Sequence, residues 1–279
     1  NKGIIRHLKP LLIMFANAAI ISIYVNFDIT MLGWYKGDSA VGIYSVAVKI
    51  YTIIKNILVA IYAVTIPRLS GYVGRNDFIG YKKLYTELVS SLAIILIPCG
   101  IGLIIVSPEI MLFMGGKECV LGYKALSVLA IALICAIFGG LVTACLNVTI
   151  GKEKDNLIAV IISALINLTL NVWFIPRFSY NGAAVTTMLS EFFVFAFCFS
   201  RIDNKAQYMN IREITTTLFH ALVGGTAMIL TNYIIRCMTH NPILILITIV
   251  SGCALIYLLI LWLFRDKCFN LYIELLKKK

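Results

Sequence analysis

Four ionisable residues lie inside long apolar segments of this chain: Asp28, Lys49, Lys55 and Glu191. Charged side chains are costly at membrane depth, so they usually face a bundle interior or a water-filled cavity. Two lysines suit an anionic head group, because ammonium groups form charge-assisted hydrogen bonds to anionic oxygens. A carboxylate nearby can take up a proton or Na⁺. Together the four residues predict transport of a negatively charged, polar cargo.

Other polar residues share a helical face with most of these charges. Residues three or four positions apart lie on the same side of a helix, and several polar residues recur at those intervals. Polar faces on different helices indicate one shared hydrophilic lumen. Lys55 lies about 120° away from the stripe of its own segment, which follows from the helical repeat. The stripes are Asn17, Tyr24 and Asp28; Ser45, Lys49, Thr52 and Asn56; Ser163, Asn167 and Asn171; and Thr187 with Glu191.

Structural roles for the same residues stay open at this point. Asparagine and serine stripes such as the one over 163–171 also hold membrane helices together. Asp28 and Lys49 can form an ion pair across a short hairpin. Lys55 can extend its ammonium group towards the membrane surface, and Glu191 can be a buried, protonated carboxyl bonded to a neighbouring helix.

The composition excludes most soluble classes. Of the 279 residues, 61% are hydrophobic and only 13% are charged, and the mean hydropathy is +0.94. A soluble domain carries about 25% charged residues, so the apolar surplus here must face lipid. The eight cysteines form no C-x-x-C pair and are interpreted as buried apolar residues. We therefore expect no metal and no cofactor.

Long apolar segments predict an all-α, polytopic membrane protein. A membrane helix needs about 20 mostly apolar residues, and the polar gaps between such segments predict loops. The longest predicted loops are 67–87 and 107–121. The eight predicted spans are 11–33, 41–66, 88–106, 122–149, 157–175, 182–200, 217–236 and 243–264.

The distribution of lysine and arginine predicts the orientation. Cytoplasmic loops of membrane proteins carry an excess of these residues, and most of the 24 here fall in alternate loops. Both termini are therefore predicted to be cytoplasmic. The net charge of +11 is then an orientation signal, and no nucleic-acid partner is expected. The basic stretches are 2–9, 68–83, 152–154, 201–212 and 265–279.

No catalytic motif accompanies the spans. The sequence contains no H-E-x-x-H, no G-x-S-x-G and no P-loop pattern. The largest predicted outer loop offers only Glu109, Lys117 and Glu118 as charged residues. These observations argue against an enzyme.

Several short motifs, in order, resemble one known family. The most specific has the form N-x-x-x-N…P…G-A-A. In this order the motifs resemble those of the second lobe of bacterial polysaccharide (O-antigen) flippases. The matching stretches are 28–33 (DITMLG), 41–50 (VGIYSVAVKI), 67–70 (PRLS), 146–154 (LNVTIGKEK), 167–171 (NLTLN), 175–178 (IPRF) and 182–187 (GAAVTT).

The resemblance implies the multidrug/oligosaccharidyl-lipid/polysaccharide exporter superfamily, whose members have two six-helix lobes around a central cavity. Residues 1–205 would form the second six-helix lobe. Residues 206–279 would form an additional C-terminal helix pair with a basic cytoplasmic tail. The chain opens on Asn1 without an initiator Met, and we expect the first lobe to precede it.

The implied cargo is an undecaprenyl-diphosphate-linked oligosaccharide, moved across the bacterial inner (plasma) membrane by alternating access in O-antigen, capsule or exopolysaccharide biosynthesis. The implied partners are this lipid-linked cargo, membrane lipids, H⁺ or Na⁺, and a polysaccharide polymerase complex. Asp28 or Glu191 is the expected ion-coupling residue, although transport without a coupling ion stays open. The expected substrate-binding residues are Asn17, Lys49, Lys55, Asn56, Arg68, Asn167 and Asn171.

Three alternatives compete with a flippase. A cation-coupled multidrug exporter has the same architecture, but two intramembrane lysines suit organic cations poorly. A membrane polysaccharide polymerase would need a longer charged outer loop than 107–121. A purely structural subunit would tolerate loss of all four buried charges.

Overall fold

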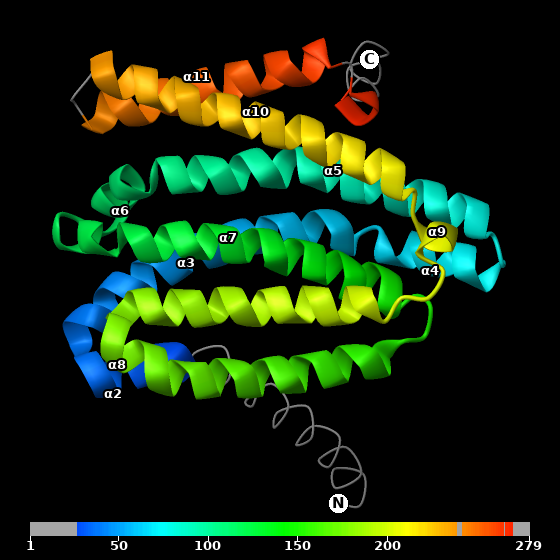
Figure 1. The fold of residues 1–279 in the computed structure, drawn as a ribbon, viewed down its shortest axis with the longest axis horizontal. Coiled ribbons are helices and arrows are strands. Elements are labelled where there is room, and N and C mark those ends of the chain that lie inside the picture. Colours follow the sequence, from blue (N-terminus) through cyan, green and yellow to red (C-terminus); the bar gives the residue numbers. More distant parts are fainter. Residues whose placement is uncertain (1–26, 239–241, 265, 270–279) are drawn as a thin grey trace, which may run out of the picture.

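The computed structural model describes residues 27–238, 242–264 and 266–269. Every regular element in these ranges is a helix, and the long helices run side by side through one bundle (Figure 1). The all-α fold class is therefore confirmed. The helices are α2 (Phe27–Lys36), α3 (Asp38–Ala63), α4 (Ile66–Gly74), α5 (Phe78–Ile105), α6 (Ser107–Gly115), η1 (Glu118–Gly122), α7 (Tyr123–Gly140), the π-helical η2 (Leu141–Asn147), α8 (Glu153–Ser200), α9 (Lys205–Tyr208), α10 (Ile211–Met238) and α11 (Pro242–Leu263).

The predicted spans from 41–66 onwards each correspond to a helix or to an arm of a helix. Five helical segments of the described ranges are long and apolar enough to cross a membrane, and α11 contains a shorter apolar stretch, Thr248–Leu263. Of the first predicted span, only 27–33 lies within the described residues, where it forms most of α2. The five segments are Asp38–Gly74, Phe78–Ile105, Glu118–Asn147, Glu153–Ser200 and Ile211–Cys237.

The helix α8 consists of two antiparallel arms. Its path reverses at Ser179, whose backbone leaves the helical region (φ 53°, ψ −136°) three residues after Pro176. Proline removes a helical hydrogen bond and clashes with the preceding turn, which favours a break here. A side chain at Gly182 would collide with the carbonyl of Phe174, so glycine lets the arms approach closely. The arms correspond to the predicted spans 157–175 and 182–200.

The two longest predicted loops are largely helical, which corrects that expectation. Residues 67–87 contain most of α4 and the first turns of α5, and residues 107–121 contain α6 and most of η1. Both α4 and α6 carry a proline in the first turn, where its missing N–H costs nothing. Asp77 caps α5 by accepting a hydrogen bond from the Gly80 amide (2.9 Å).

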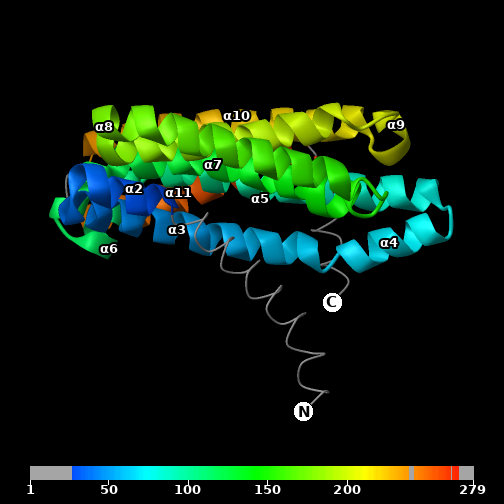
Figure 2. The ribbon, with the colours of Figure 1, turned by 90° about the horizontal axis from the view of Figure 1, so that it is seen from below.

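Two apolar cores hold the bundle together. The larger core joins α2, α3, α5, α7 and both arms of α8, whereas the smaller one joins α5, α10 and α11. Helix α10 packs against α5 and α11, which places the C-terminal pair at one edge of the bundle (Figure 1). Helices α3 and α4 lie along another side (Figure 2). One face of α3 is therefore free of helix contacts among the described residues.

Candidate functional site

A cavity of about 260 Å³ lies among the helices of the larger apolar core, and residues from α2, α3, α7 and α8 line it. It contains three of the four ionisable residues that the sequence singles out. Thr187 and Glu191, which lie one turn apart on the second arm of α8, contribute polar groups to its wall. The lining residues are Asp28, Tyr44, Val48, Tyr51, Thr52, Lys55, Leu129, Val160, Ser163, Asn167, Thr187, Ser190, Glu191 and Val194.

Lys55 and Glu191 form an ion pair across this cavity. The Lys55 Nζ lies 2.6 Å from Glu191 Oε1, and the side chains remain 30% and 26% exposed. Tyr51 joins the pair, because Lys55 Nζ donates to its hydroxyl oxygen (3.1 Å) and that hydroxyl donates to Glu191 Oε1 (3.3 Å). These three residues connect α3 to the second arm of α8. The pair compensates both charges while leaving part of each group open to the cavity.

Asp28 lies in the same cavity and has a different set of partners. Its Oδ2 accepts a hydrogen bond from the Tyr44 hydroxyl (2.8 Å), and its Oδ1 accepts one from the Ile29 amide (2.9 Å). No lysine, arginine or histidine of the described ranges pairs with it. Asp28 is thus the cavity carboxylate whose charge no side chain in the described structure neutralises.

The asparagine stripe of α8 divides into a structural and an accessible part. Asn171 is buried, donates through Nδ2 to Asn167 Oδ1 (3.0 Å), and accepts a hydrogen bond from the Thr186 hydroxyl on the other arm. The Ser163 hydroxyl likewise donates to the Ser190 carbonyl oxygen (3.1 Å). These contacts tie the two arms of α8 together. Asn167 lines the cavity, whereas Asn171 does not.

Lys49 and Asn56 lie on the exposed face of α3. Both are exposed, and the Lys49 ammonium has no hydrogen bond or ion pair within the part of the chain that the structure describes. The sequence alternative of an Asp28–Lys49 pair is therefore not formed. Thr52 lines the cavity from the same stripe and so connects Lys49 and Asn56 to it. The polar stripe leads from the cavity onto a surface that no other described helix covers.

Two other residues from the sequence prediction lie elsewhere. Arg68 is exposed on α4 and lines a separate pocket of about 310 Å³ with Tyr72 and Arg75. That pocket lies beyond the end of α3, away from the cavity. Asn17 lies outside the described residues.

The sequence prediction missed two tyrosines that organise the cavity. Tyr44 holds Asp28, and Tyr51 holds both members of the Lys55–Glu191 pair. A signal for them exists, because Tyr44, Tyr51 and Lys55 recur at seven- and four-residue intervals on α3, which puts them on one face. Buried tyrosine hydroxyls usually find a hydrogen-bond partner, so this face indicates polar partners opposite.

The cavity can bind either an anion or a cation. An anion can compete with Glu191 for Lys55, and a cation can occupy the unpaired Asp28. The donors and acceptors around them, Thr187 and Asn167, suit hydroxyl-bearing ligands. Within the described ranges, no three His, Cys, Asp or Glu side chains gather in a geometry that could hold a metal ion.

Comparison with known proteins identifies similar chains. The sequence profile of a family described as "Polysaccharide biosynthesis protein" matches residues 4–73. The probable low-salt glycan biosynthesis flippase Agl15 of Haloferax volcanii is 27% identical over 174 residues, covering 60% of this chain and 35% of that protein. The probable flippase AglR of the same organism is 28% identical over 169 residues, with the same coverage. The chain thus spans about a third of these curated relatives.

The fold is also similar to a solved structure. The lipid II flippase MurJ in its inward closed conformation superposes with a TM-score of 0.75 and 19% identity, over 93% of this chain and 54% of that one. This likeness supports a polytopic membrane fold. The resemblance drawn from the motifs is thus confirmed as a similarity in sequence to the polysaccharide biosynthesis family and two archaeal flippases, and in fold to MurJ.

Proposed function

We propose that this chain contributes to moving a lipid-linked oligosaccharide across a membrane by alternating access, and that it is a transporter rather than an enzyme. The observation that carries the proposal is the charged cavity between α2, α3 and α8, which places Asp28, Lys55 and Glu191 together inside an apolar bundle. Such residues are costly in a membrane and mark substrate and ion pathways. The isoprenoid tail can stay in the bilayer while the polar head crosses through this region.

The cationic side chains are proposed to receive the phosphates of the cargo. Lys49 is exposed without a partner among the described residues, and Lys55 is held by a single carboxylate oxygen. A diphosphate carries more charge than Glu191 and can displace it from Lys55. Charge-assisted hydrogen bonds to phosphate are strong enough to offset the loss of the protein pair. Cargo binding would then release Glu191 on the opposite wall.

Asp28 is proposed as the ion-coupling residue in preference to Glu191. Lys55 already compensates the charge of Glu191 at 2.6 Å, whereas the hydrogen-bond partners of Asp28 in the described ranges, which include Tyr44 and the Ile29 amide, are neutral groups. An uncompensated carboxylate at membrane depth is stabilised by taking up a proton or a metal cation. Binding of H⁺ or Na⁺ at Asp28 would therefore change the charge of the cavity during the cycle.

The amides are proposed to contact the sugar hydroxyls to different extents. Asn167 faces the cavity and Asn56 lies on the stripe beside it, so both can bind hydroxyl groups. Asn17 is proposed for the same role from the sequence alone. Asn171 uses its amide to join the arms of α8, which favours a supporting role. Arg68, at the end of α4, suits phosphates that approach along the membrane surface.

The cargo is proposed to be an undecaprenyl-diphosphate-linked repeat unit for O-antigen or a related glycan, carried across a bacterial inner membrane. Residues 1–205 would form one six-helix lobe, and residues 206–279 an additional helix pair. Both ends of the chain would be cytoplasmic, and a polysaccharide polymerase would receive the flipped unit. The archaeal relatives, one of which is named as a glycan biosynthesis flippase, support a glycan as the cargo; the identity of its lipid carrier is proposed from the sequence resemblance.

A reconstituted flipping assay tests the function. The full-length protein is placed in liposomes with a fluorescent lipid-linked oligosaccharide, and the fraction reaching the opposite leaflet is measured by membrane-impermeant quenching. Protein-dependent flipping that Lys49→Gln reduces about tenfold at equal insertion supports the proposal. Lys124→Gln, on the first turn of α7 outside the cavity, is the matched control. Absence of flipping, together with export of organic cations, would instead identify a multidrug exporter.

A further inference from the structure

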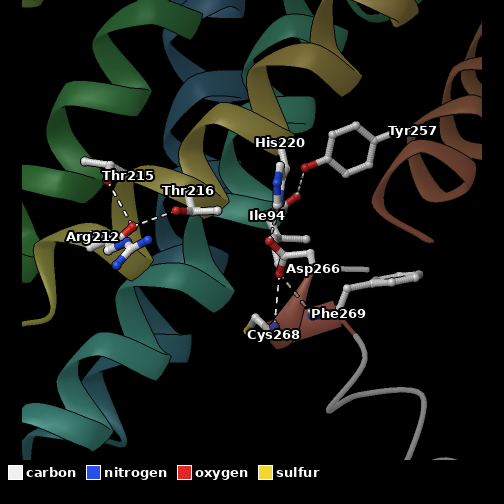
Figure 3. A network of polar contacts seen from close by, with 9 residues as sticks. All are labelled: Ile94, Arg212, Thr215, Thr216, His220, Tyr257, Asp266, Cys268 and Phe269. Carbon is white, nitrogen blue, oxygen red and sulfur yellow. Dashed lines mark hydrogen bonds and ion pairs between the residues drawn. The ribbon is translucent and has the colours of Figure 1, made fainter. Parts of the chain in front are cut away.

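A second cavity, of about 470 Å³, lies apart from the central one, between the start of α10 and the residues that follow α11. Figure 3 shows this region, with Arg212 and Thr216 on α10 and His220 beside Asp266. Lys267 and Thr217 also line it. This end of the bundle carries most of the basic residues of the described structure, including those at 201–212. The cavity therefore lies where a membrane-spanning helix pair meets a basic surface.

One wall of this cavity is fixed by a fully satisfied carboxylate. Asp266 is only 2% exposed, and its Oδ2 lies 2.9 Å from Nδ1 of His220. Its Oδ1 accepts hydrogen bonds from the amides of Cys268 (3.0 Å) and Phe269 (3.3 Å) (Figure 3). Both oxygens of Asp266 are therefore held by partners inside the protein, and this carboxylate shapes the wall of the cavity.

Two donors in the cavity have no partner among the described residues. The Arg212 guanidinium makes no hydrogen bond or ion pair with the described residues; only its carbonyl oxygen is used, by Thr215 and Thr216 (Figure 3). Thr217 is 3% exposed and lines the cavity. Its hydroxyl has no hydrogen-bond partner in the described part of the chain. A ligand oxygen in the cavity can therefore accept a hydrogen bond from this hydroxyl.

A third donor lies at the mouth of the cavity. The Lys267 ammonium is mostly exposed and is 3.9 Å from a carboxylate oxygen of Glu213, which is too long for a strong hydrogen bond. Glu213 also accepts a hydrogen bond from the Asn210 amide (3.3 Å). A guanidinium, a hydroxyl and an ammonium around one cavity match the oxygens of a phosphate group.

The surroundings of the cavity indicate a lipid as the source of that phosphate. Phe264 stacks on His220 with ring centroids 4.9 Å apart, and Phe219 precedes His220 on α10. Both phenylalanines are exposed, as expected for side chains that contact acyl chains near the membrane surface. Basic pockets between membrane helices on the cytoplasmic side bind lipid head groups. A phospholipid can thus place its phosphate in the cavity and its chains against these rings.

We propose that this cavity binds the phosphate head group of a membrane phospholipid, with Arg212 and Thr217 as the main contacts and Lys267 at its mouth. The site goes beyond the proposed transport function, because its residues lie on α10 and after α11, whereas the central cavity is lined by α2, α3, α7 and α8. A bound lipid here would fasten the C-terminal helix pair to the surrounding membrane.

Native mass spectrometry of the full-length protein tests the site. The protein is released from detergent after incubation with phosphatidylglycerol, and lipid retention is compared with Arg212→Gln/Lys267→Gln and with the near-isosteric Thr217→Val. We expect retention of one lipid to weaken about tenfold in the double variant and several-fold in Thr217→Val. Lys154→Gln, an exposed lysine at the same end of the bundle, is the control and should retain lipid as the wild type does.

Three outcomes would overturn the proposal. Equal lipid retention by all variants would show that the lipid binds elsewhere. Equal loss in Lys154→Gln would show a general effect of surface charge. Complete displacement of the lipid by millimolar inorganic phosphate would identify a site for a free anion. Matching thermal unfolding of each variant without lipid shows that the substitutions leave the fold intact, and flipping by the purified protein reports separately on the transport function.

Discussion

Two ion pairs in the bundle have similar lengths but different surroundings. Lys55 and Glu191 approach to 2.6 Å in the central cavity, whereas Arg236 and Glu109 approach to 2.7 Å between α10 and α6. Each pair joins segments more than a hundred residues apart in the sequence. Each also lies among apolar helices, where a charge without a partner would be costly.

The pairs differ in how completely their hydrogen-bonding groups are used. Arg236 binds both carboxylate oxygens of Glu109, the carbonyl oxygen of Ile105 and the side chain of Asn232. Lys55 contacts one carboxylate oxygen and one tyrosine hydroxyl, and it borders a cavity. A saturated bidentate pair acts as a fixed clamp, while a point charge beside a cavity can exchange its partner for a ligand. On this basis we assign a structural role to the Arg236–Glu109 pair and propose a functional role for the Lys55–Glu191 pair.

The largest expected effect is the loss of transport in Lys55→Met. This variant removes the cation that we assign to the cargo and leaves Glu191 unpaired in the cavity. A hydrogen bond to a charged group contributes about 1.5–3 kcal/mol, so losing this contact to the cargo should lower the flipping rate about 30-fold. Initial flipping rates in liposomes measure this, normalised to the inserted protein.

The matched control for Lys55→Met is Lys117→Met, which removes a lysine from the short connection before η1. It should flip the lipid at the wild-type rate. If Lys55→Met also retained that rate, the cavity pair would be a clamp like the Arg236 pair, and the distinction drawn from geometry would fail.

The next effect separates the two carboxylates of the cavity. Asp28→Asn cannot take up a proton or coordinate Na⁺ as a carboxylate does, so transport should lose its dependence on either ion gradient. Glu191→Gln should keep that dependence, because Glu191 is charge-compensated by Lys55. The measurement is the flipping rate with and without imposed H⁺ and Na⁺ gradients. The opposite pattern, with Glu191→Gln insensitive to both gradients, would assign the coupling to Glu191.

A moderate effect is expected at the clamp. Arg236→Gln leaves the carboxylate of Glu109, which is 9% exposed, without its cation and should destabilise the fold by about 2 kcal/mol. For a chain of this size that corresponds to a melting temperature lower by about 5 °C in detergent. Adding Glu109→Gln should recover part of the loss, because it removes the unpaired charge. The flipping rate per folded molecule should stay unchanged, and a large fall would show that this pair takes part in transport.

The smallest effect is expected at an exposed pair outside the membrane-spanning helices. Lys152 Nζ lies 2.7 Å from Oδ2 of Asp203, and the hydrogen bond and charge of Lys152 lower the pKa of Asp203 below its usual 3.8. The stability from this pair is present above pH 3.8 and is lost as the pH falls through the lowered pKa of the folded state. The slightly lower melting temperature of Asp203→Asn should therefore converge on that of the wild type in strong acid. A difference that persists or grows there would contradict this assignment.

The sequence predicted the helices better than it predicted their partners. Length and apolarity locate the membrane spans, because about 20 apolar residues suffice to cross a bilayer. The short helices α4 and α6 were missed because polar residues in 67–87 and 107–121 suggested loops, although Pro67 and Pro108 mark helix starts.

The sequence named the charged residues of the cavity one by one, but it did not predict which of them contact each other. Periodicity places Lys55 and Glu191 on the faces of their own helices, yet their contact spans 136 residues and depends on how α3 packs against α8. The same limit explains Asp28, whose partner Tyr44 lies on the next helix. Helical spacing reports which residues share a face, and it contains no information on which faces meet.

The reversal of α8 at Ser179 affects how the cavity can change shape. Hydrogen bonds from Thr186 to Asn171 and from Ser163 to Ser190 join its two arms. We therefore expect the helical hairpin to move as one rigid unit. Glu191 and Asn167 lie on the two tied arms, so for the proposed transport cycle we expect the cavity to open and close by movement of α2 and α3 relative to α8. A disulfide across the two arms should therefore leave turnover intact, while one from α3 to α8 should arrest it.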